Sequence, residues 1–80
     1  MEKLLTAIVE PLIENVEQFT IQVRKNETTG YTVYHIRVAK SDMGRVIGKN
    51  GRIAKVIRTI IRSAAARKGE KAVVEIDECE

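Results

Sequence analysis

Four residues, Gly48-Lys49-Asn50-Gly51, stand between two segments of helical period in the most basic part of the chain. A loop with glycine at both ends can bring its main-chain amides close to a ligand, because no Cβ stands in the way. The helix expected after the loop has first amides that lack intrahelical partners and favour an anion. The loop itself carries a lysine and no carboxylate. These features predict a site for the phosphate groups of a nucleic acid backbone.

Charge is distributed unevenly along the 80 residues, although the net charge is only +3. Residues 37–71 contain eleven lysines and arginines against two acidic residues, a local balance of +9. Residues 1–36 have three basic and five acidic side chains, and residues 72–80 have four acidic ones, so the flanks amount to −2 and −4. A basic middle between acidic ends is expected of a phosphate-binding face. Taken alone, such a cluster would equally fit a solvated helix surface.

The basic side chains near the loop are spaced so that they converge on it. Arg45 precedes the loop by one helical turn. Arg52, Lys55 and Arg62 follow it near one stripe of the next helix, because steps of three and seven residues return to the same side. Loop amides, a helix N-terminus and cations therefore meet in one place, which favours nucleic-acid binding over an ordinary solvated surface.

Three other interpretations of the glycines were weighed. Asn50-Gly51 is a favoured hairpin dipeptide, but helical periodicity on both sides leaves no strands for it to join. The stretch from Gly44 resembles a nucleotide-binding P-loop, yet only three residues separate Gly44 from Gly48, and Asn50 stands where that motif needs a hydroxyl. The third interpretation, a purely structural linker that reverses the chain between two helices, stays open.

The elements that position the loop are predicted from hydrophobic period and turn residues. Apolar residues recur at spacings of three and four over about residues 2–17, which predicts an amphipathic helix. Pro11 removes one hydrogen bond inside it, so we expect a kink or two short helices. Alternating patterns predict strands over residues 19–24, 31–39 and 72–77. The turn at 26–30, ending at Gly30, makes the first two strands an antiparallel hairpin.

Two helices are expected to flank the loop, a brief one that Ser41 caps and that ends at Ile47, and a longer one that ends before Gly69. The order α-β-β-α-α-β, with a connection to the last strand long enough for a parallel crossover, predicts an α+β fold. Its three-stranded mixed sheet should have the helices packed on one face. The predicted apolar stripe of the longer helix is Ile53, Val56, Ile57, Ile60, Ile61 and Ala64.

Length and cysteine content bound the organisation of the chain. Residues 1–80 are expected to form one domain, with a small core that needs no metal or cofactor. The only cysteine, Cys79, cannot form an intramolecular disulfide, which favours a reducing compartment. No apolar run long enough for membrane insertion and no export signal is seen, so we expect a cytoplasmic protein.

Catalysis is not predicted. His35 stands alone in a strand pattern, without partners at ligand spacing, and is interpreted as a surface histidine. The acidic residues near the C-terminus are interpreted as a short solubilising tail. Because no nucleophile and base are placed together, we expect a protein that is not an enzyme.

The run Arg45-Val46-Ile47-Gly48-Lys49-Asn50-Gly51-Arg52-Ile53 resembles the V-I-G-x-x-G signature of KH (K-homology) domains. The predicted element order resembles the type II, prokaryotic version of that fold. At this length the chain is similar to the small stand-alone bacterial KH proteins of the KhpA type.

The resemblance implies a site for about four nucleotides of single-stranded RNA, clamped at its backbone by the loop. Lys49 and Asn50 would be the variable pair of the loop, and the isoleucines on either side would form an apolar floor for the bases. A variable loop at about residues 66–71 would add basic side chains. The candidate RNA-binding residues are Arg45, Ile47, Gly48, Lys49, Asn50, Gly51, Arg52, Ile53, Lys55, Arg67 and Lys68.

Aromatic residues are scarce and absent from the basic segment, which predicts modest affinity and little base stacking in the groove. Tighter binding would then need avidity. The resemblance implies a homodimer, or a heterodimer with a larger KH-domain protein of the KhpB type, acting as an RNA chaperone or adaptor. A protein-interaction module that mainly dimerises and a ribosome-associated assembly factor are the alternatives.

Overall fold

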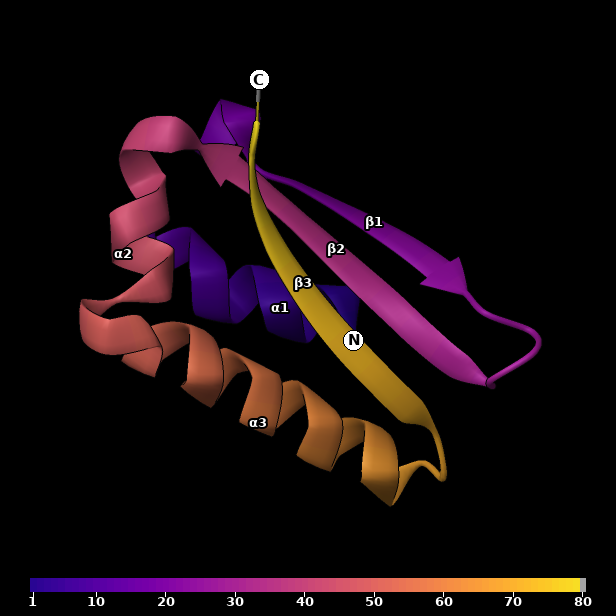
Figure 1. The fold of residues 1–80 in the computed structure, drawn as a ribbon. Coiled ribbons are helices and arrows are strands. Elements are labelled where there is room, and N and C mark those ends of the chain that lie inside the picture. Colours follow the sequence, from indigo (N-terminus) through magenta and orange to yellow (C-terminus); the bar gives the residue numbers. More distant parts are fainter. Residues whose placement is uncertain (80) are drawn as a thin grey trace.

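The computed structural model describes residues 1–79 and contains a three-stranded sheet with its helices on one face (Figure 1). This α+β fold and its order α-β-β-α-α-β are as predicted from the sequence. The main elements are α1 (Glu2–Val9), β1 (Thr20–Lys25), β2 (Tyr31–Ala39), α2 (Met43–Ile47), α3 (Arg52–Arg67) and β3 (Lys71–Cys79).

The sheet has the order β1-β2-β3 and is mixed. β1 and β2 pair antiparallel, with Ile21 opposite Ile36, and β2 and β3 pair parallel, with Ile36 opposite Ile76. The connection between the parallel strands runs through α2, the glycine loop and α3. This crossover places the loop at one end of α3 and β3 along the side of the same helix (Figure 1).

The predicted helix over residues 2–17 is interrupted at its proline. α1 ends at Val9, a short 3₁₀ turn follows over Glu10–Leu12, and Ile13 is extended with φ −109° and ψ 156°. A second 3₁₀ turn covers Val16–Gln18. The expected break at Pro11 is thus confirmed, because a proline ring and its missing N–H do not fit a helix interior.

The hairpin turn is held by local hydrogen bonds. The side-chain oxygen of Asn26 accepts bonds from the backbone amides of Thr28 (3.0 Å) and Thr29 (3.2 Å), which is an Asx turn. Gly30 has a φ of +79°, as the sequence predicted. The turn fixes the register of β1 against β2, and so decides which side chains of the sheet face the helices.

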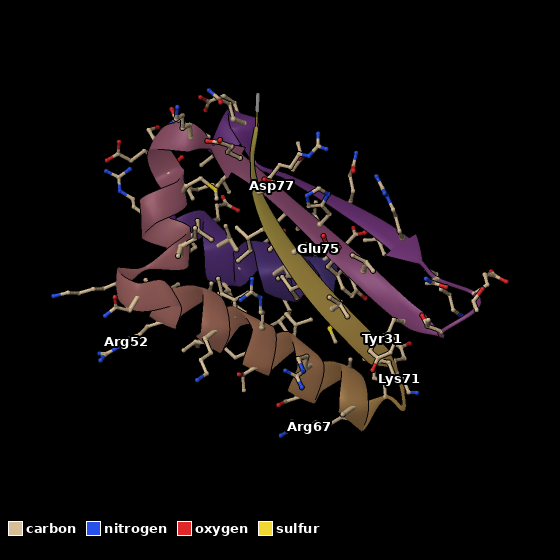
Figure 2. The ribbon with its side chains drawn as sticks, viewed as in Figure 1. Tyr31, Arg52, Arg67, Lys71, Glu75 and Asp77 are labelled. Carbon is tan, nitrogen blue, oxygen red and sulfur yellow. The ribbon has the colours of Figure 1, made fainter. Side chains whose placement is uncertain are left out.

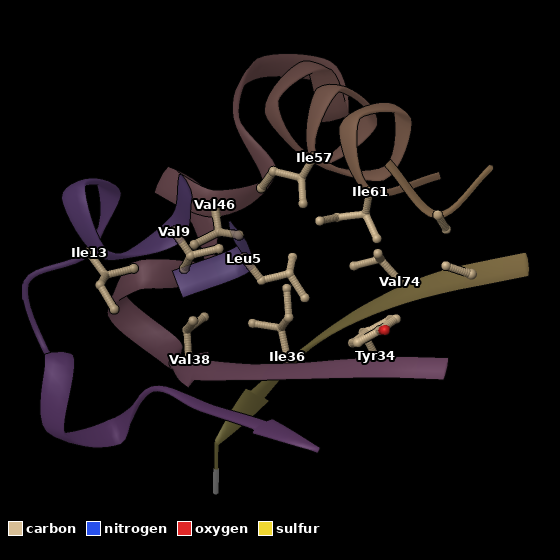
Figure 3. Packing of buried hydrophobic residues seen from close by; sticks show 12 residues of the cluster. Leu5, Val9, Ile13, Tyr34, Ile36, Val38, Val46, Ile57, Ile61 and Val74 are labelled. Carbon is tan, nitrogen blue, oxygen red and sulfur yellow. The ribbon is translucent and has the colours of Figure 1, made fainter. Parts of the chain in front are cut away.

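The core lies between the helices and the inner face of the sheet (Figure 3). On α3 the buried face is narrower than predicted, because it is limited to Ala54, Ile57, Ile61 and Ala65, at steps of three, four and four residues. Val56 is 55% exposed and Ile60 is 37% exposed, so the prediction that both belong to the core face is wrong. The buried cluster comprises Leu5, Val9, Ile13, Tyr34, Ile36, Val38, Val46, Ile57, Ile61, Ala65, Ala72 and Val74.

The end of α3 forms the glycine C-cap that the sequence predicted. Gly69 has a φ of +71°, and the amides of Gly69 and Glu70 donate to the carbonyls of Ala66 (3.0 Å) and Ala65 (2.9 Å). The connecting loop is shorter than expected, because Arg67 still belongs to the helix.

The acidic residues near the C-terminus do not form a separate tail. Glu75, Asp77 and Glu78 lie within β3, which runs on to Cys79 and is longer than the predicted 72–77. Glu80, the fourth acidic residue of that prediction, lies outside the described residues. These three acidic side chains therefore belong to the sheet.

Candidate nucleic-acid interface

The loop between α2 and α3 contains three residues with uncommon backbone conformations. Gly48 has φ +74° and ψ −179°, a region that is essentially restricted to glycine. Asn50 (φ 57°, ψ 28°) and Gly51 (φ 73°, ψ 15°) are both left-handed, which glycine tolerates freely and asparagine better than most residues. The path of the chain therefore requires glycine at position 48, and it favours asparagine at position 50 and glycine at position 51.

Close packing adds a second requirement at Gly48. A Cβ built on this residue would lie 2.6 Å from Cγ1 of Ile53, closer than real side chains approach. At Gly51 an added Cβ would meet nothing within 4 Å. The first glycine thus lets the first turn of α3 pack directly against the loop, which places both isoleucines, Ile47 and Ile53, half-buried beside it.

Two amides of the loop remain for a ligand. The Gly48 amide donates to the Gly44 carbonyl (2.9 Å), and the Gly51 amide donates to the Gly48 carbonyl (3.3 Å). Among the hydrogen bonds of the described residues, none uses the backbone amide of Lys49 or of Asn50. Successive free amides in a tight turn form an anion-binding concavity. The amides of Lys49 and Asn50 are therefore available to donate hydrogen bonds to an anion.

Asp42 holds the helix that precedes the loop. Its fully buried carboxylate accepts hydrogen bonds from the backbone amides of Glu14 (3.1 Å) and Asn15 (3.0 Å) and from the Asn15 side chain (3.2 Å). The prediction that Ser41 caps this helix is wrong. The Ser41 hydroxyl makes no capping bond and accepts one from the Asn15 side chain, and the aspartate ties the start of α2 to the segment after α1.

Arg45 joins the same cluster. Its guanidinium lies 2.9 Å from the Asp42 carboxylate and 3.0 Å from that of Glu14. The backbone amide of Glu14 is the main reason that the pKa of Asp42 is lowered, and the Asn15 amides and Arg45 lower it further, against the opposing effect of burial. Arg45 therefore neutralises a buried carboxylate and orients α2, while 46% of its side chain stays exposed beside the loop.

Basic residues of α3 and the exposed edge of β3 form a groove. Its hollows are lined on the helix side by Arg58 and Arg62, and on the strand side by Val73 and Val74. Arg58 reaches across, and its Nε donates to the Val74 carbonyl at 3.4 Å. The candidate residues chosen from the sequence omitted Arg58 and Arg62. Their position on the polar face of α3 is visible in the sequence, but the strand opposite them is not.

The structure does not bring all the predicted site residues together. Arg45, the loop and the first turn of α3, which includes Arg52 and Lys55, lie at one end of the groove. Arg67 and Lys68 lie at the opposite end of α3, whose 16 residues span about 24 Å. Figure 2 shows Arg52 and Arg67 at these two ends. The two groups of cations can therefore contact the same ligand only if it extends along the helix.

Within residues 1–79, no cluster of three or more histidine, cysteine, aspartate or glutamate side chains could hold a metal ion. None of the helices described there is long and apolar enough to cross a membrane. The His35 imidazole lies 3.5 Å from the Asp77 carboxylate on the outer sheet face, away from the groove-lining arginines.

The element order, together with a G-x-x-G loop between two helices of the crossover, defines the class of type II KH domains. The chain belongs to the family described as KhpA/KhpB, KH domain, which residues 2–76 match. A crystal structure of Aquifex aeolicus Era bound to GDP and AlF4⁻ has a similar fold over 96% of this chain and 30% of that one, with a TM-score of 0.60 at 12% identity.

The similarity to curated relatives extends over nearly the whole of both chains. The chain is 42% identical to the RNA-binding protein KhpA of Listeria monocytogenes over 98% of this chain and 100% of the relative. The corresponding protein of Clostridium acetobutylicum is 42% identical over 95% and 99% of the two chains. That of Chlamydia trachomatis is 37% identical over 98% and 97%. All three carry the name RNA-binding protein KhpA.

Proposed function

We propose that this chain binds single-stranded RNA, with the loop gripping the sugar–phosphate backbone and the α3–β3 groove receiving the bases. The observation that carries the proposal is the pair of unused amides at Lys49 and Asn50, presented by a backbone that needs glycine on both sides. The RNA-binding names of the relatives support the same ligand. Arg52 and Lys55 supply positive charge around this contact, while Arg45, which is paired with Asp42 and Glu14, orients α2 beside it.

The charges on the two sides of the groove support one placement of the strand. α3 presents Arg58 and Arg62, whereas β3 carries Glu75 and Asp77, which the pairing register places on the outer sheet face (Figure 2). Phosphates are attracted to the helix and repelled by the carboxylates. The RNA backbone therefore follows the loop and the helix, and the bases point towards the strand.

We further propose that the protein acts as an RNA chaperone or adaptor on cytoplasmic RNA, as one domain and without catalysis. A site for about four nucleotides with few aromatic side chains gives modest affinity. Pairing with a second copy, or with a larger KH-domain protein of the KhpB type, would raise the affinity through avidity. Action as a ribosome-associated assembly factor is tested by co-sedimentation with ribosomal subunits.

One observation favours the alternative that the chain serves mainly as a protein-interaction module. Val56 and Ile60 are large apolar side chains exposed on α3, and Leu4 is exposed on α1. Apolar side chains exposed near one another often belong to protein contacts. If this alternative holds, self-association will persist in variants whose loop can no longer bind a phosphate.

A charge reversal in the loop tests RNA binding. In the K49D/N50D variant, two carboxylates replace the cation and the amide beside the phosphate position. The matched control is K25D/N26D, which makes the same two changes at the β1–β2 turn, where an aspartate can replace Asn26 as the acceptor of the Asx turn. Fluorescence anisotropy with labelled single-stranded RNA measures the affinity, and circular dichroism checks the fold.

We expect K49D/N50D to weaken binding at least tenfold and to flatten the dependence of the dissociation constant on salt, while the control stays close to wild type. Equal loss in the two variants would mean that only the net charge matters. Unchanged affinity and salt dependence in K49D/N50D would show that the loop does not hold the RNA, and the interaction module would then be the better description.

A further inference from the structure

The groove does not end at Val73 and Val74 but continues towards the C-terminal end of α3. A second hollow there shares its lining residues Tyr31, Arg62 and Ala72 with the first. Its volume of about 520 Å³ lies within the range of about 300–1,000 Å³ found for sites that take small ligands. We call it the Tyr31 hollow; the rest of its lining is Thr59, Ser63, Ala66, Glu70 and Lys71.

An aromatic ring stands in this hollow although the sequence shows no aromatic residue in the basic segment. Tyr31 is the first residue of β2 and pairs in register with Lys71, the first residue of β3. The Lys71 ammonium lies 5.5 Å from the centroid of the ring, a cation–π contact that holds the ring beside the strand (Figure 2). Tyr31 stays 40% exposed. The expectation that the groove offers little stacking surface therefore overlooked this ring.

The other groups in the Tyr31 hollow suit the remaining parts of a nucleotide. Arg62 and Lys71 provide two cations against one acid, Glu70. The Thr59 hydroxyl donates to the Lys55 carbonyl at 2.9 Å, which leaves its oxygen free to accept a hydrogen bond from a ribose hydroxyl or a base amino group. A flat π surface, a hydroxyl acceptor and an excess of positive charge match a base, a sugar and a phosphate.

The position of the hollow decides which nucleotide it could take. Arg52 and Arg62 are ten residues apart on α3, which corresponds to about 15 Å along the helix. The loop at the N-terminal end is the expected anchor for about four nucleotides. A longer strand that follows the basic side of α3 reaches the Tyr31 hollow next.

We infer that the Tyr31 hollow is an additional nucleotide subsite, in which a base of single-stranded RNA beyond the loop-bound segment stacks on the Tyr31 ring. This inference rests on the proposed function, because it needs the RNA to lie in the α3–β3 groove. It makes binding depend on the length of the strand, and it lets one chain exceed the affinity expected from the loop alone.

The test compares Y31F, which keeps the ring, with Y31L, which keeps an apolar side chain but has no π surface. Each variant is titrated with oligouridylates of four and of about eight nucleotides, and circular dichroism monitors the fold. We expect Y31F to bind both lengths like wild type. We expect Y31L to bind the longer RNA about 5- to 100-fold more weakly and the four-nucleotide RNA unchanged, since base–aromatic stacking has this magnitude.

A second readout reports stacking itself. The fluorescent base 2-aminopurine is quenched when it stacks, so it is placed at successive positions of the longer RNA. Wild type and Y31F should quench it at one position far from the loop-bound segment, and Y31L should not. Equal binding of both lengths by Y31L and wild type, or equal loss in Y31L and Y31F, would overturn the subsite. Failure of wild type to bind RNA, or unchanged binding by K49D/N50D, would overturn the loop proposal and the subsite with it.

Discussion

Gly48 and Ile53 pack so closely that a Cβ added to the glycine would lie 2.6 Å from Cγ1 of the isoleucine. The two residues are on opposite sides of the loop, one ending α2 and the other in the first turn of α3. Their contact closes a loop in which the amides of Lys49 and Asn50 make no hydrogen bond among the described residues. The spacing between the signature glycine and the isoleucine is thus a packing requirement.

Substituting the two glycines separates packing from backbone strain. G48A should destabilise the fold by about 1–3 kcal/mol from its backbone conformation alone, with the clash against Ile53 added. In G51A the added Cβ has no atom within 4 Å. This variant should lower the free energy of unfolding by only about 1–2 kcal/mol, which is the cost of an alanine in the left-handed conformation. Urea unfolding measures both. The double variant G48A/I53A should be more stable than the sum of the single effects predicts, because the 2.6 Å approach to Cγ1 is removed and only the 2.9 Å approach to the Cβ of residue 53 is left; strict additivity would argue against the contact.

Two isoleucines one turn apart on α3 should respond very differently to truncation. Ile57 is fully buried, so I57A should lower the free energy of unfolding by about 2–5 kcal/mol. Ile60 is 37% exposed, and I60A should lower it by less than about 1 kcal/mol. Thermal and urea unfolding give the comparison. Similar losses at the two positions would mean that α3 is rotated relative to the sheet.

The buried carboxylate of Asp42 should make stability depend on pH. Its pKa in the folded protein is lowered below the ordinary value of 3.8, so folding favours the charged form. The stabilisation is present above about pH 4 and is lost as the pH falls through the lowered pKa. D42N lacks this effect and should be less stable than wild type at neutral pH. The difference in free energy of unfolding between the two proteins should become smaller below about pH 4. A difference that stays constant across this range in urea unfolding would contradict the assignment.

The dependence of RNA affinity on salt concentration should report the number of phosphate contacts along α3. Three to five contacts predict a log–log slope of the binding constant against salt of about −2 to −3.5, at roughly −0.7 per phosphate of a single strand. R62Q should reduce the size of this slope by about 0.7. The control R37Q changes a cation that the register places on the outer sheet face. If R37Q flattens the slope as much as R62Q does, the RNA does not lie in the groove.

Much of the fold could be predicted from the sequence because local signals agree with tertiary packing. Pro11 and Gly30 give the breaks and turns directly, and the apolar pattern gives the order of helices and strands. The rotation of α3 was less accessible, since Ile60 and Ile61 both fit a helical stripe and only the packed sheet decides between them. A wide apolar stripe leaves the buried side of a helix uncertain by about one residue step.

The candidate site could likewise be predicted only in part from the sequence. The loop and the cations around it are close together in the sequence, so their spacing alone was enough to predict them as one site. The hydrogen bonds from the amides of Glu14 and Asn15 to the Asp42 carboxylate join residues that are 28 and 27 positions apart. No local sequence pattern predicts them. The position of Tyr31 in a hollow beside α3 could not be predicted for the same reason, because it depends on the pairing of β2 with β3.

The hydrogen bonds to the Asp42 carboxylate also have a consequence for backbone motion. The amides of Glu14 and Asn15 belong to neither a helix nor a strand, yet both donate to a fully buried carboxylate. Deuterium should consequently enter these two positions as slowly as it enters the central strand, while their irregular neighbours exchange quickly. Opening that short stretch would break the hydrogen bonds that tie the start of α2 to the segment after α1, so the loop that we propose to bind RNA depends in part on residues remote in the chain.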